Sequence, residues 1–507
     1  MDSRLSEMVY LMPDLPVENC LLIDPVQSAL SAKVRRFAND LQIIEFSELD
    51  KLAPHSKQLI GNFNQSVSPA SFFRKSFNLL DSRGACFAVV NRRNAIDNLI
   101  QGALEQRLLA KMVVDCGYQD VRLYGIAPSI ADPRLLVPVH KKSRLTAASL
   151  GLYQPSLPKA KMRKGLSFIL GFVGLARLWT PHILLIGSKA AYSGGSGLNR
   201  ILAPHYSGGT ECALFTGTPG ELRKPTLQIM DQRGAILGYA KIAAKPELER
   251  LLDNEAKILE TLQASRLRTA ETPFLLASER LGDQIQIIVL STTKKPFSSG
   301  PAKLTTGHLE FLVELFNGQR KDSKIGNSSF YNGLIRRLTR MDGGLSPSWK
   351  QIFEAAIKEI SKAIHQSLPF GMAHRDFTPW NTYAADGKLN VFDWEFARKD
   401  WPPLIDPLHF ILQKGVVVEK QTHLGLSDKI LSSNRPEGAF IRTYLHRIGV
   451  ARKFLKLLMI FYLVDIAILY LEKHSRESAA SINDQALLRA WQGLLSGLLA
   501  GKGGITP

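Results

Sequence analysis

Two carboxylates and an amide stand at short spacings between residues 371 and 397. Asp376 ends a His-Arg-Asp triplet, Asn381 follows five residues later, and Asp393 precedes a Trp-Glu pair. Carboxylate and amide oxygens are ligands that suit a hard cation such as Mg²⁺. We therefore expect Asn381 and Asp393 to hold a magnesium ion between them, which leaves Asp376 to receive the proton of a hydroxyl group. This combination of groups is typical of phosphoryl transfer.

Short strands and a turn are expected to position these groups. The Asp-Gly pair at 386–387 is a hairpin turn signal, and the predicted second strand, 389–392, presents Asp393 at its end. The His-Arg-Asp triplet lies in a loop after a predicted helix. Asn381 and Asp393 therefore fall on neighbouring backbone segments.

A lysine in an apolar strand is a further candidate. Lys241 lies in the predicted strand 235–242, and a buried ammonium group needs an anionic partner. The helix predicted to follow offers Glu255, with Glu249 and Glu260 as alternatives. A surface lysine beside a solvated helix acid would give the same pattern.

A loop with two glycines precedes this strand. Gly217 and Gly220 lie between predicted apolar strands. Glycines let backbone N–H groups come close to phosphate oxygens. Plain hairpins have the same composition, so the loop by itself leaves both interpretations open.

The segment 371–397 resembles the catalytic and metal-binding loops of the aminoglycoside phosphotransferase and choline kinase family, which are relatives of the protein kinases. Most members of that family have Gly or Asn where this chain has Arg375, a position that supplies no catalytic group. The resemblance implies a two-lobed, α+β protein-kinase-like domain over residues 205–507, with the lobes meeting near residue 290. It also implies ATP, or another nucleoside triphosphate, and Mg²⁺ as cofactors.

The resemblance assigns roles to single residues. Lys241, held by Glu255, would contact the α- and β-phosphates. The backbone at Leu290 and Ser291 would meet the adenine edge, and Glu395 is a weaker candidate for a supporting role at the metal.

The implied reaction is the ATP-dependent phosphorylation of a hydroxyl group on a small molecule. Sugars, amino alcohols, aminoglycoside-like compounds and glycan intermediates are the acceptor classes that we consider. The alternative is a nucleotide-binding pseudokinase or regulatory module, which the intact Lys241, Asp376, Asn381 and Asp393 argue against.

The length and composition describe a globular chain with more than one domain. With 507 residues, 45% of them hydrophobic and 21% charged, the chain is long enough for two or three domains. Its four cysteines have no CxxC or CxxH spacing, so we expect buried thiols rather than disulfides or a zinc site. The first residues carry acids where a signal peptide needs basic residues. These features predict a cytoplasmic protein.

Residues 1–190 are predicted to form an α/β domain, because short apolar runs of strand length alternate with helical patterns. Residues 75–140 resemble the closing part of a class I methyltransferase domain. That family's Gly-x-Gly turn after the first strand is missing, so we expect a degenerate scaffold that does not bind S-adenosylmethionine. The same absence argues against the alternative of a methyltransferase with an accessory kinase-like domain.

The net charge of +19 is concentrated in one stretch. Residues 133–200 carry eleven Lys and Arg residues and neither Asp nor Glu, which favours reversible contact with an anionic membrane surface. We expect no nucleic-acid partner. Within the basic and apolar segment 133–187, the run 165–187 is predicted to be an interdomain helix, an interfacial helix or a membrane span. Residues 191–204 are predicted to be a flexible linker.

Further predictions concern the C-terminal part. Asp406 is predicted to cap the helix that follows it. Residues 452–472 are apolar nearly all round but include Asp465, and we expect the central helix of a helical lobe rather than a membrane span. His374 and Trp380 are expected to pack the loop around Asp376.

Overall fold

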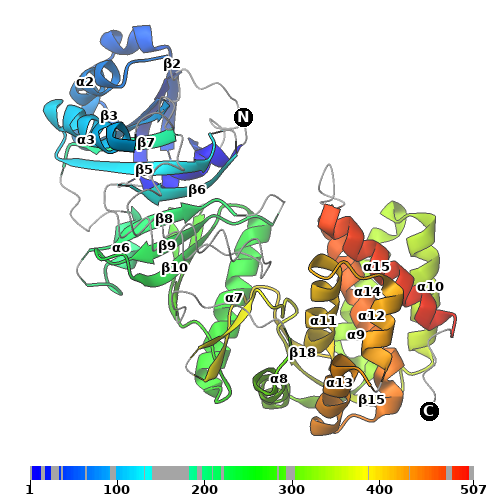
Figure 1. Ribbon diagram of the computed structural model, residues 1–507. Helices are drawn as coiled ribbons and strands as arrows, with labels where there is room; N and C mark the ends of the chain where they lie inside the picture. The colour runs from blue at the N-terminus through cyan, green and yellow to red at the C-terminus, as the bar shows by residue number, and fades with distance from the viewer. Residues whose placement is uncertain are drawn as a thin grey trace.

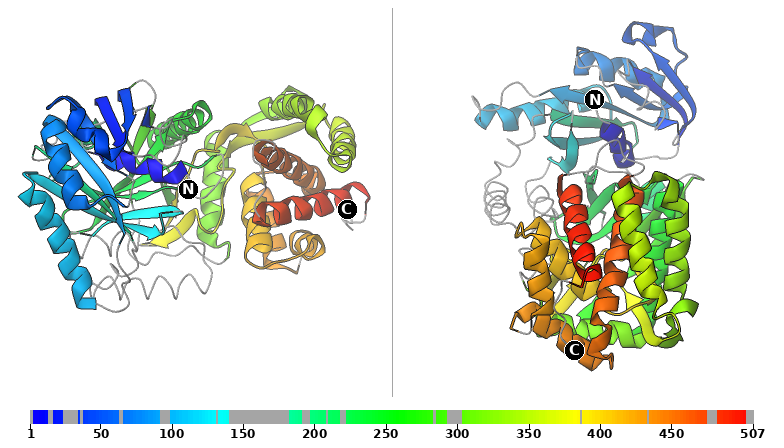
Figure 2. Two further views of the ribbon diagram at one scale, coloured as in Figure 1. Left: turned by 90° about the horizontal axis from the view of Figure 1, so that it is seen from above. Right: turned by 90° about the vertical axis from the view of Figure 1, so that its right-hand side faces the viewer.

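The computed structural model describes residues 3–12, 17–23, 34–35, 38–62, 66–91, 99–130, 132–139, 182–190, 197–207, 209–217, 222–282, 285–292, 303–385, 387–432, 434–474 and 482–501. Within them the chain is a mixed α/β structure with one large sheet and many helices (Figure 1). The sheet is built from strands between Val17 and Ser291, and most helices that follow gather in a separate group (Figure 2).

One sheet of twelve strands runs through the described residues, in the order β12-β13-β10-β9-β8-β6-β5-β7-β4-β3-β1-β2. Its strands are β1 (Val17–Ile23), β2 (Ala38–Ile44), β3 (Lys57–Asn62), β4 (Leu80–Asn91), β5 (Asp120–Pro128), β6 (Pro133–Pro138), β7 (His182–Ser188), β8 (Glu211–Phe215), β9 (Thr226–Met230), β10 (Ile236–Ala243), β12 (Leu275–Leu281) and β13 (Ile285–Ser291). The neighbours among β1 to β4 pair in parallel, and the remaining neighbouring pairs are antiparallel.

Burial on both faces explains the apolar runs of the N-terminal strands. In β1, Leu21 and Ile23 pack into one core, and Cys20 and Leu22 pack into the other. The first core includes side chains of α2 (Pro69–Leu79) and α3 (Leu99–Asp115), and the second includes those of the 3₁₀ helix η1 (Ser3–Leu11) and of α6 (Gly197–Leu202). Successive side chains of a strand point to opposite faces, so a strand covered on both sides is apolar throughout.

The structure corrects the predicted helix at 165–187. His182–Ser188 is β7, a strand between β4 and β5 in the large sheet, and Ile183 and Ile186 are buried. A short apolar run that is buried on both faces cannot be told from a buried helix by its periodicity, which is the reason for the wrong prediction. Residues 165–181 lie outside the described residues.

The sheet crosses the place where the sequence predicts a domain boundary. β6 pairs with β8, and Leu136 lies opposite Leu214. The described part of the predicted linker, 191–204, includes the helix α6, in which Ile201 and Leu202 are buried. The two halves of the chain therefore share one sheet, and their division into separate domains stays a prediction.

The C-terminal half is mainly helical after β13. Its helices are α8 (Thr306–Gly318), α9 (Ser329–Met341), α10 (Pro347–Ser361), α11 (Ile405–Val417), α12 (His423–Leu431), α13 (Pro436–Arg447), α14 (Leu455–His474) and α15 (Ile482–Leu499). One small sheet consists of β11 (Ala270–Glu271), β17 (Lys388–Val391) and β16 (Thr382–Ala385), and another of β14 (Lys321–Lys324), β15 (Ser367–Ala373) and β18 (Arg398–Trp401). Short 3₁₀ helices are η2 (Phe46–Lys51), η4 (Ile325–Asn327), η5 (Asp342–Gly344) and η6 (Arg452–Phe454).

Helix α14 is the central helix of this group. It contacts α9, α10, α11 and α15, and most of its side chains belong to the largest hydrophobic core. By length and composition, Arg452–Lys473 could cross a membrane, but 67% of its most apolar window is buried inside the protein. The prediction of a central helix is confirmed.

Candidate active site

A tight hairpin positions the predicted metal ligands. β16 and β17 pair in antiparallel register, and Gly387 has φ 75° in the turn between them, as the Asp-Gly signal predicts. The amide of Phe392 donates to the carbonyl oxygen of Asn381, 3.2 Å away. Asp393 follows with φ 73°, a conformation that residues other than glycine rarely adopt. The hairpin thus brings Asn381 next to the strand end that carries Asp393.

Lys241 connects three separate elements. Its Nζ lies 2.7 Å from each carboxylate oxygen of Glu255 and 2.7 Å from Oδ1 of Asp393. The sequence offered Glu255 as the partner, with Glu249 and Glu260 as alternatives. In the structure the partner is Glu255, which is fully buried in α7 (Pro246–Ser265). Strand β10, helix α7 and the segment after β17 therefore meet at one ammonium group.

Mutual attraction stabilises the charged forms in this cluster. Partial burial lowers the pKa of the Lys241 ammonium group, but Asp393 and Glu255 outweigh this effect and raise the pKa above its ordinary value. Partial burial likewise raises the pKa of Asp393, but Lys241 and Lys224 outweigh it and hold the pKa below its ordinary value. Both Lys241 and Asp393 are therefore charged at neutral pH.

Lys224 belongs to the site although the sequence did not reveal it. It lies shortly before β9, and its Nζ forms an ion pair with Oε2 of Glu395. Burial raises the pKa of Glu395 to about 7, against the opposing effect of Lys224. No apolar strand surrounds Lys224 in the sequence, so the signal that identified Lys241 did not apply to it.

The donor atoms of the cluster fit a hard cation. One carboxylate oxygen from each of Glu255, Asp393 and Glu395 lies within 4.8 Å of the others. Asn381 offers an amide oxygen from the segment that pairs with the end of β17. Oxygen donors of this kind suit Mg²⁺, so these residues could hold the ion that the sequence predicts.

Asp376 is held at both of its carboxylate oxygens. Nδ2 of Asn381 donates to Oδ2 over 2.8 Å, and Nε2 of His409, from α11, lies 3.2 Å from Oδ1. Because a carboxylate only accepts, Nε2 carries the hydrogen of this bond, and Nδ1 lies 3.2 Å from the hydroxyl of Tyr462. Burial raises the pKa of Tyr462 well above its ordinary value, so its hydroxyl stays protonated. The side chain of Asp376 is still 29% exposed, which leaves it open to an acceptor molecule.

Asp406 organises the loop that carries Asp376. Its two carboxylate oxygens accept from the backbone amides of His374 and Arg375, each over 2.8 Å. It lies in the first turn of α11 but does not cap that helix, whose N-cap residue is Leu404, so the predicted role is corrected. Burial raises the pKa of Asp406 above its ordinary value. The signal in the sequence was an acid inside an apolar stretch, which requires a buried partner.

Arg375 has a structural role that the sequence did not show. Its guanidinium contacts Asp465 of α14 over 2.7 and 2.9 Å and lies 4.8 Å from the ring of Trp401. Arg337 of α9 also donates to Asp465, over 2.7 Å. Burial raises the pKa of Asp465, but the two arginines outweigh it and hold the pKa below its ordinary value. The loop around Asp376 is thereby fixed to the central helix.

The segment after β17 is held from two sides. Nδ2 of Asn254, on α7, donates to the carbonyl oxygens of Glu395 and Ala397 over 2.9 and 3.0 Å. The ring of His374 lies 4.5 Å from that of Trp394, in agreement with a packing role. Helix α7 and the loop around Asp376 therefore position the acidic cluster together.

The glycine loop lies partly outside the described residues, which include Gly217 but not Gly220. Gly217 has φ 82°, and a Cβ there would lie 2.8 Å from Cγ of Arg223 and 2.9 Å from the carbonyl oxygen of Lys224. Only glycine fits such a close approach of the two arms of the loop. The structure thus requires glycine at 217 for steric reasons.

The adenine contact at Leu290 and Ser291 stays a prediction, but the backbone amide of Ser291 already has a partner inside the protein. It donates to the carbonyl oxygen of Phe274, the residue before β12, over 2.9 Å. This N–H is therefore not available to an adenine edge. Leu290 is buried in the same strand, opposite Tyr239 of β10.

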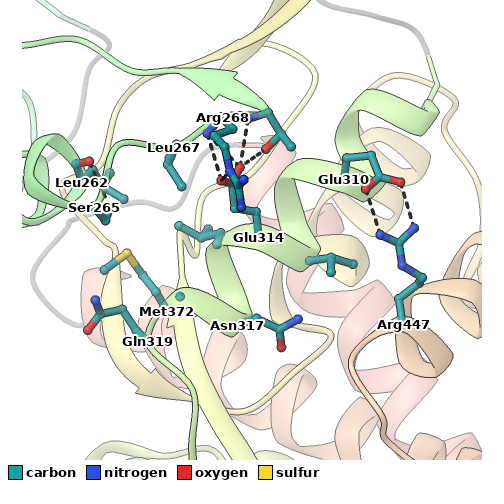
Figure 3. Close-up of a pocket in the computed structure, with 14 residues that line it drawn as sticks. Leu262, Ser265, Leu267, Arg268, Glu310, Glu314, Asn317, Gln319, Met372 and Arg447 are labelled. Carbon is teal, nitrogen blue, oxygen red and sulfur yellow. Dashed lines mark hydrogen bonds and ion pairs between the residues drawn. The ribbon is translucent and has the colours of Figure 1, made fainter.

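A pocket of about 460 Å³ lies apart from these residues, at the end of α7 and along α8 (Figure 3). Glu310 and Arg447 form an ion pair in its wall, with atoms 2.8 Å apart. Glu314 accepts from the backbone amides of Arg268 and Thr269. Both acids thus pair with groups of the pocket's own wall, and none of the predicted site residues lines this pocket.

Comparison with known proteins returned structures but no sequence family. Neither a protein-family model nor a curated protein matches the chain. Among solved structures, the thermostable mutant of aminoglycoside phosphotransferase APH(4)-Ia in its apo form is 11% identical, with a TM-score of 0.41 over 60% of this chain and 99% of that one. The amicoumacin kinase hAmiN in complex with AMP-PNP, Ca²⁺ and Ami is 13% identical, with a TM-score of 0.38 over 58% and 90%.

A GDP complex of a mutant aminoglycoside 2'-phosphotransferase-IIIa is 12% identical, with a TM-score of 0.39 over 60% of this chain and 96% of that one. These structural neighbours are small-molecule phosphotransferases by their names. Because the TM-scores are below 0.5, these neighbours say nothing about the chemistry of the site, and only the site's own geometry bears on it. The methyltransferase resemblance of residues 75–140 is not shown by these comparisons.

Proposed function

We propose that this protein transfers the γ-phosphoryl group of ATP, or of another nucleoside triphosphate, to a hydroxyl group of a small molecule. One observation carries the proposal: Nζ of Lys241 lies 2.7 Å from both Glu255 and Asp393. Residues predicted separately, from a strand, a helix and a loop, meet at this ammonium group. A lysine held by a helix glutamate beside a metal-binding aspartate is the arrangement with which protein kinases transfer phosphoryl groups.

Lys241 is the group that positions the phosphates. Glu255 orients its ammonium group from the buried side, and the side chain of Lys241 is itself only 14% exposed. An ammonium group at this depth interacts with a phosphate more strongly than it would in water. The glycine at 217 allows the loop backbone to come close to the same phosphates.

Asn381 and Asp393 would hold Mg²⁺, with Glu395 beside them. When bound, the ion would neutralise the negative charge on the phosphate oxygens and orient them. The protein holds both side chains in position, because the hairpin positions Asn381 and the contact with Lys241 positions Asp393.

Asp376 is the group that takes the proton. The acceptor oxygen forms a bond to the γ-phosphorus, the bond between that phosphorus and the bridging oxygen breaks, and the nucleoside diphosphate leaves. The hydroxyl proton passes to the carboxylate of Asp376, which Asn381 and His409 hold in one orientation. Orientation of this kind supports a positioned base.

The acceptor is proposed only as a class. Sugars, amino alcohols, aminoglycosides and glycan intermediates are the compounds to be screened. A cytoplasmic location stays a proposal. So does reversible contact with an anionic membrane surface, which the basic segment 133–200 favours.

The direct test is a transfer assay with ATP labelled at its γ-phosphate. Purified protein is incubated with a panel of hydroxyl compounds, with Mg²⁺ and with excess chelator in parallel. The proposal predicts transfer of label to at least one acceptor, and only with Mg²⁺. Binding of ATP without transfer to any compound or to water would favour the pseudokinase alternative instead.

A further inference from the structure

The loop between β8 and β9 carries a second lysine into the acidic cluster. Lys224 lies on the return arm of this loop, shortly before β9, and forms an ion pair with Glu395. The side chains of Lys224 and Glu395 are only 8% and 9% exposed. A solvated surface lysine would not be buried in this way, so Lys224 is part of a built site.

Lys224 and Lys241 face the same group of carboxylates. Glu395 has an oxygen within 4.8 Å of oxygens of Asp393 and Glu255, which are the two partners of Lys241. Two ammonium groups therefore stand against three carboxylates. A nucleoside triphosphate and its metal ion would bring both an anion for the ammonium groups and a cation for the carboxylates.

Neighbouring residues fix the position of Lys224. Its carbonyl oxygen would lie 2.9 Å from a Cβ at Gly217, so the two arms of the loop are in close contact. The adjacent Arg223 donates to Oε1 of Glu7 over 3.3 Å, and Glu7 is a buried residue of η1. The loop is thus held by the N-terminal part of the chain on one side and by Glu395 on the other.

We propose that Lys224 is a second phosphate-binding lysine, which exchanges Glu395 for a phosphate oxygen when a nucleotide binds. This inference rests on the proposed function, because it concerns the same nucleotide site. The competing explanation is that the pair of Lys224 and Glu395 is a permanent tie between the loop and the acidic segment. The two explanations differ in what happens when the pair is broken from the Glu395 side.

The test measures nucleotide affinity in the absence of metal. ATP and adenosine are titrated by calorimetry at pH 8 with excess chelator, into the wild type, Lys224→Met, Lys224→Arg and Glu395→Gln. Lys257→Met, which removes an exposed charge from α7, is the matched control. Thermal unfolding of each variant shows that it is folded.

A phosphate-binding lysine predicts that Lys224→Met weakens ATP binding by about tenfold or more, the effect of losing a charge-assisted hydrogen bond. Adenosine binding should not change, Lys224→Arg should recover part of the loss, and Glu395→Gln should bind ATP at least as tightly as the wild type. Equal losses of ATP affinity in Lys224→Met and Glu395→Gln, or unchanged ATP binding in Lys224→Met, would overturn the inference. Failure of the wild type to bind ATP either with chelator or with Mg²⁺ would instead refute the proposed function.

Discussion

The carboxylate of Asp376 combines fixed orientation with access to an acceptor. Each of its oxygens has a hydrogen-bonding partner, from Asn381 and from His409, while its side chain remains 29% exposed. A substitution that keeps the shape but removes the basic oxygen loses one of these two hydrogen bonds, and it should affect the chemistry far more than the binding of ATP. Asp376→Asn is expected to bind ATP as the wild type does and to lower the catalytic rate by roughly two to four orders of magnitude. Parallel losses of affinity and rate, measured by titration and steady-state kinetics, would contradict the assigned role.

His409 is expected to act as a positioning residue for Asp376. Its Nε2 is 3.2 Å from Oδ1 of Asp376, and the ring is buried. His409→Phe removes the donor and keeps the ring, whereas His409→Gln retains an N–H donor. We expect the rate to fall about tenfold in His409→Phe, with a smaller loss in His409→Gln and unchanged ATP affinity in both. Equal rates in the two variants would show that the hydrogen bond does not matter.

Glu395 makes the stability of the protein depend on pH. Burial raises its pKa from the ordinary 4.5 to about 7, so the folded state binds the proton more tightly than the unfolded state does. The contribution of Glu395 to the free energy of unfolding should therefore decrease as pH rises from about 4.5 to about 7, and level off above that range. Urea unfolding of the wild type and Glu395→Gln across this range should show a difference that changes with pH. A constant difference would mean that Glu395 has no raised pKa.

At the level of elements, the sequence predicts local patterns such as turns, but it does not reveal most of the distant residues that a buried charged side chain contacts. The hairpin before Asp393 follows from an Asp-Gly turn, and the need of a strand lysine for an anion indicated Glu255 but left Glu249 and Glu260 open. Lys224 was missed because nothing in its neighbours along the chain shows that it is buried beside Glu395. The role of Asp406 was misjudged because its partners, two backbone amides, come from a loop about thirty residues earlier.

Strand β7 shows most clearly that a local sequence pattern cannot always distinguish a strand from a helix. Its central residues, ILLI at 183–186, are all apolar because both faces of the sheet are covered there. The same run would suit a buried helix, and only its partners β4 and β5 decide between the two structures. Those partners come from residues 80–128, which the local pattern does not include.

The position of β7 decides which residues a test of membrane contact can alter. Residues 182–187 lie inside the large sheet, so their removal would damage the fold rather than a membrane-binding surface. Because β5 separates β6 from β7, the two strands need a long connection, and residues 141–181 are therefore replaced by a Gly-Ser linker of the same length. We expect the full chain to pellet with anionic vesicles more than with neutral ones, and this replacement to abolish the difference. Unchanged pelleting of the replacement variant would assign the contact to another part of the protein.

At the scale of the whole molecule, the large sheet joins the two halves of the chain. β6 covers the edge of β8, and Thr216 donates to the carbonyl oxygens of Arg134 and Pro133 over 3.1 and 2.7 Å. Removal of residues 1–204 would expose that strand edge and remove the partner of Arg223. Exposed edges promote aggregation, so we expect the truncated chain to elute as aggregates on size exclusion and to lose ATP binding. A monomer with wild-type affinity would show that the C-terminal half folds independently.

Phosphoryl transfer is proposed to take place at the cluster of Lys241, Glu255 and Asp393. Asp393→Ala removes the carboxylate that contacts Lys241, and Asp428→Ala, at an exposed position of α12, is the matched control. The most direct measurement is the rate of label transfer from γ-labelled ATP to an acceptor found in the screen, for the wild type and both variants. We expect no detectable transfer in Asp393→Ala and a wild-type rate in Asp428→Ala. A folded Asp393→Ala variant that transfers label at the wild-type rate would contradict this proposal.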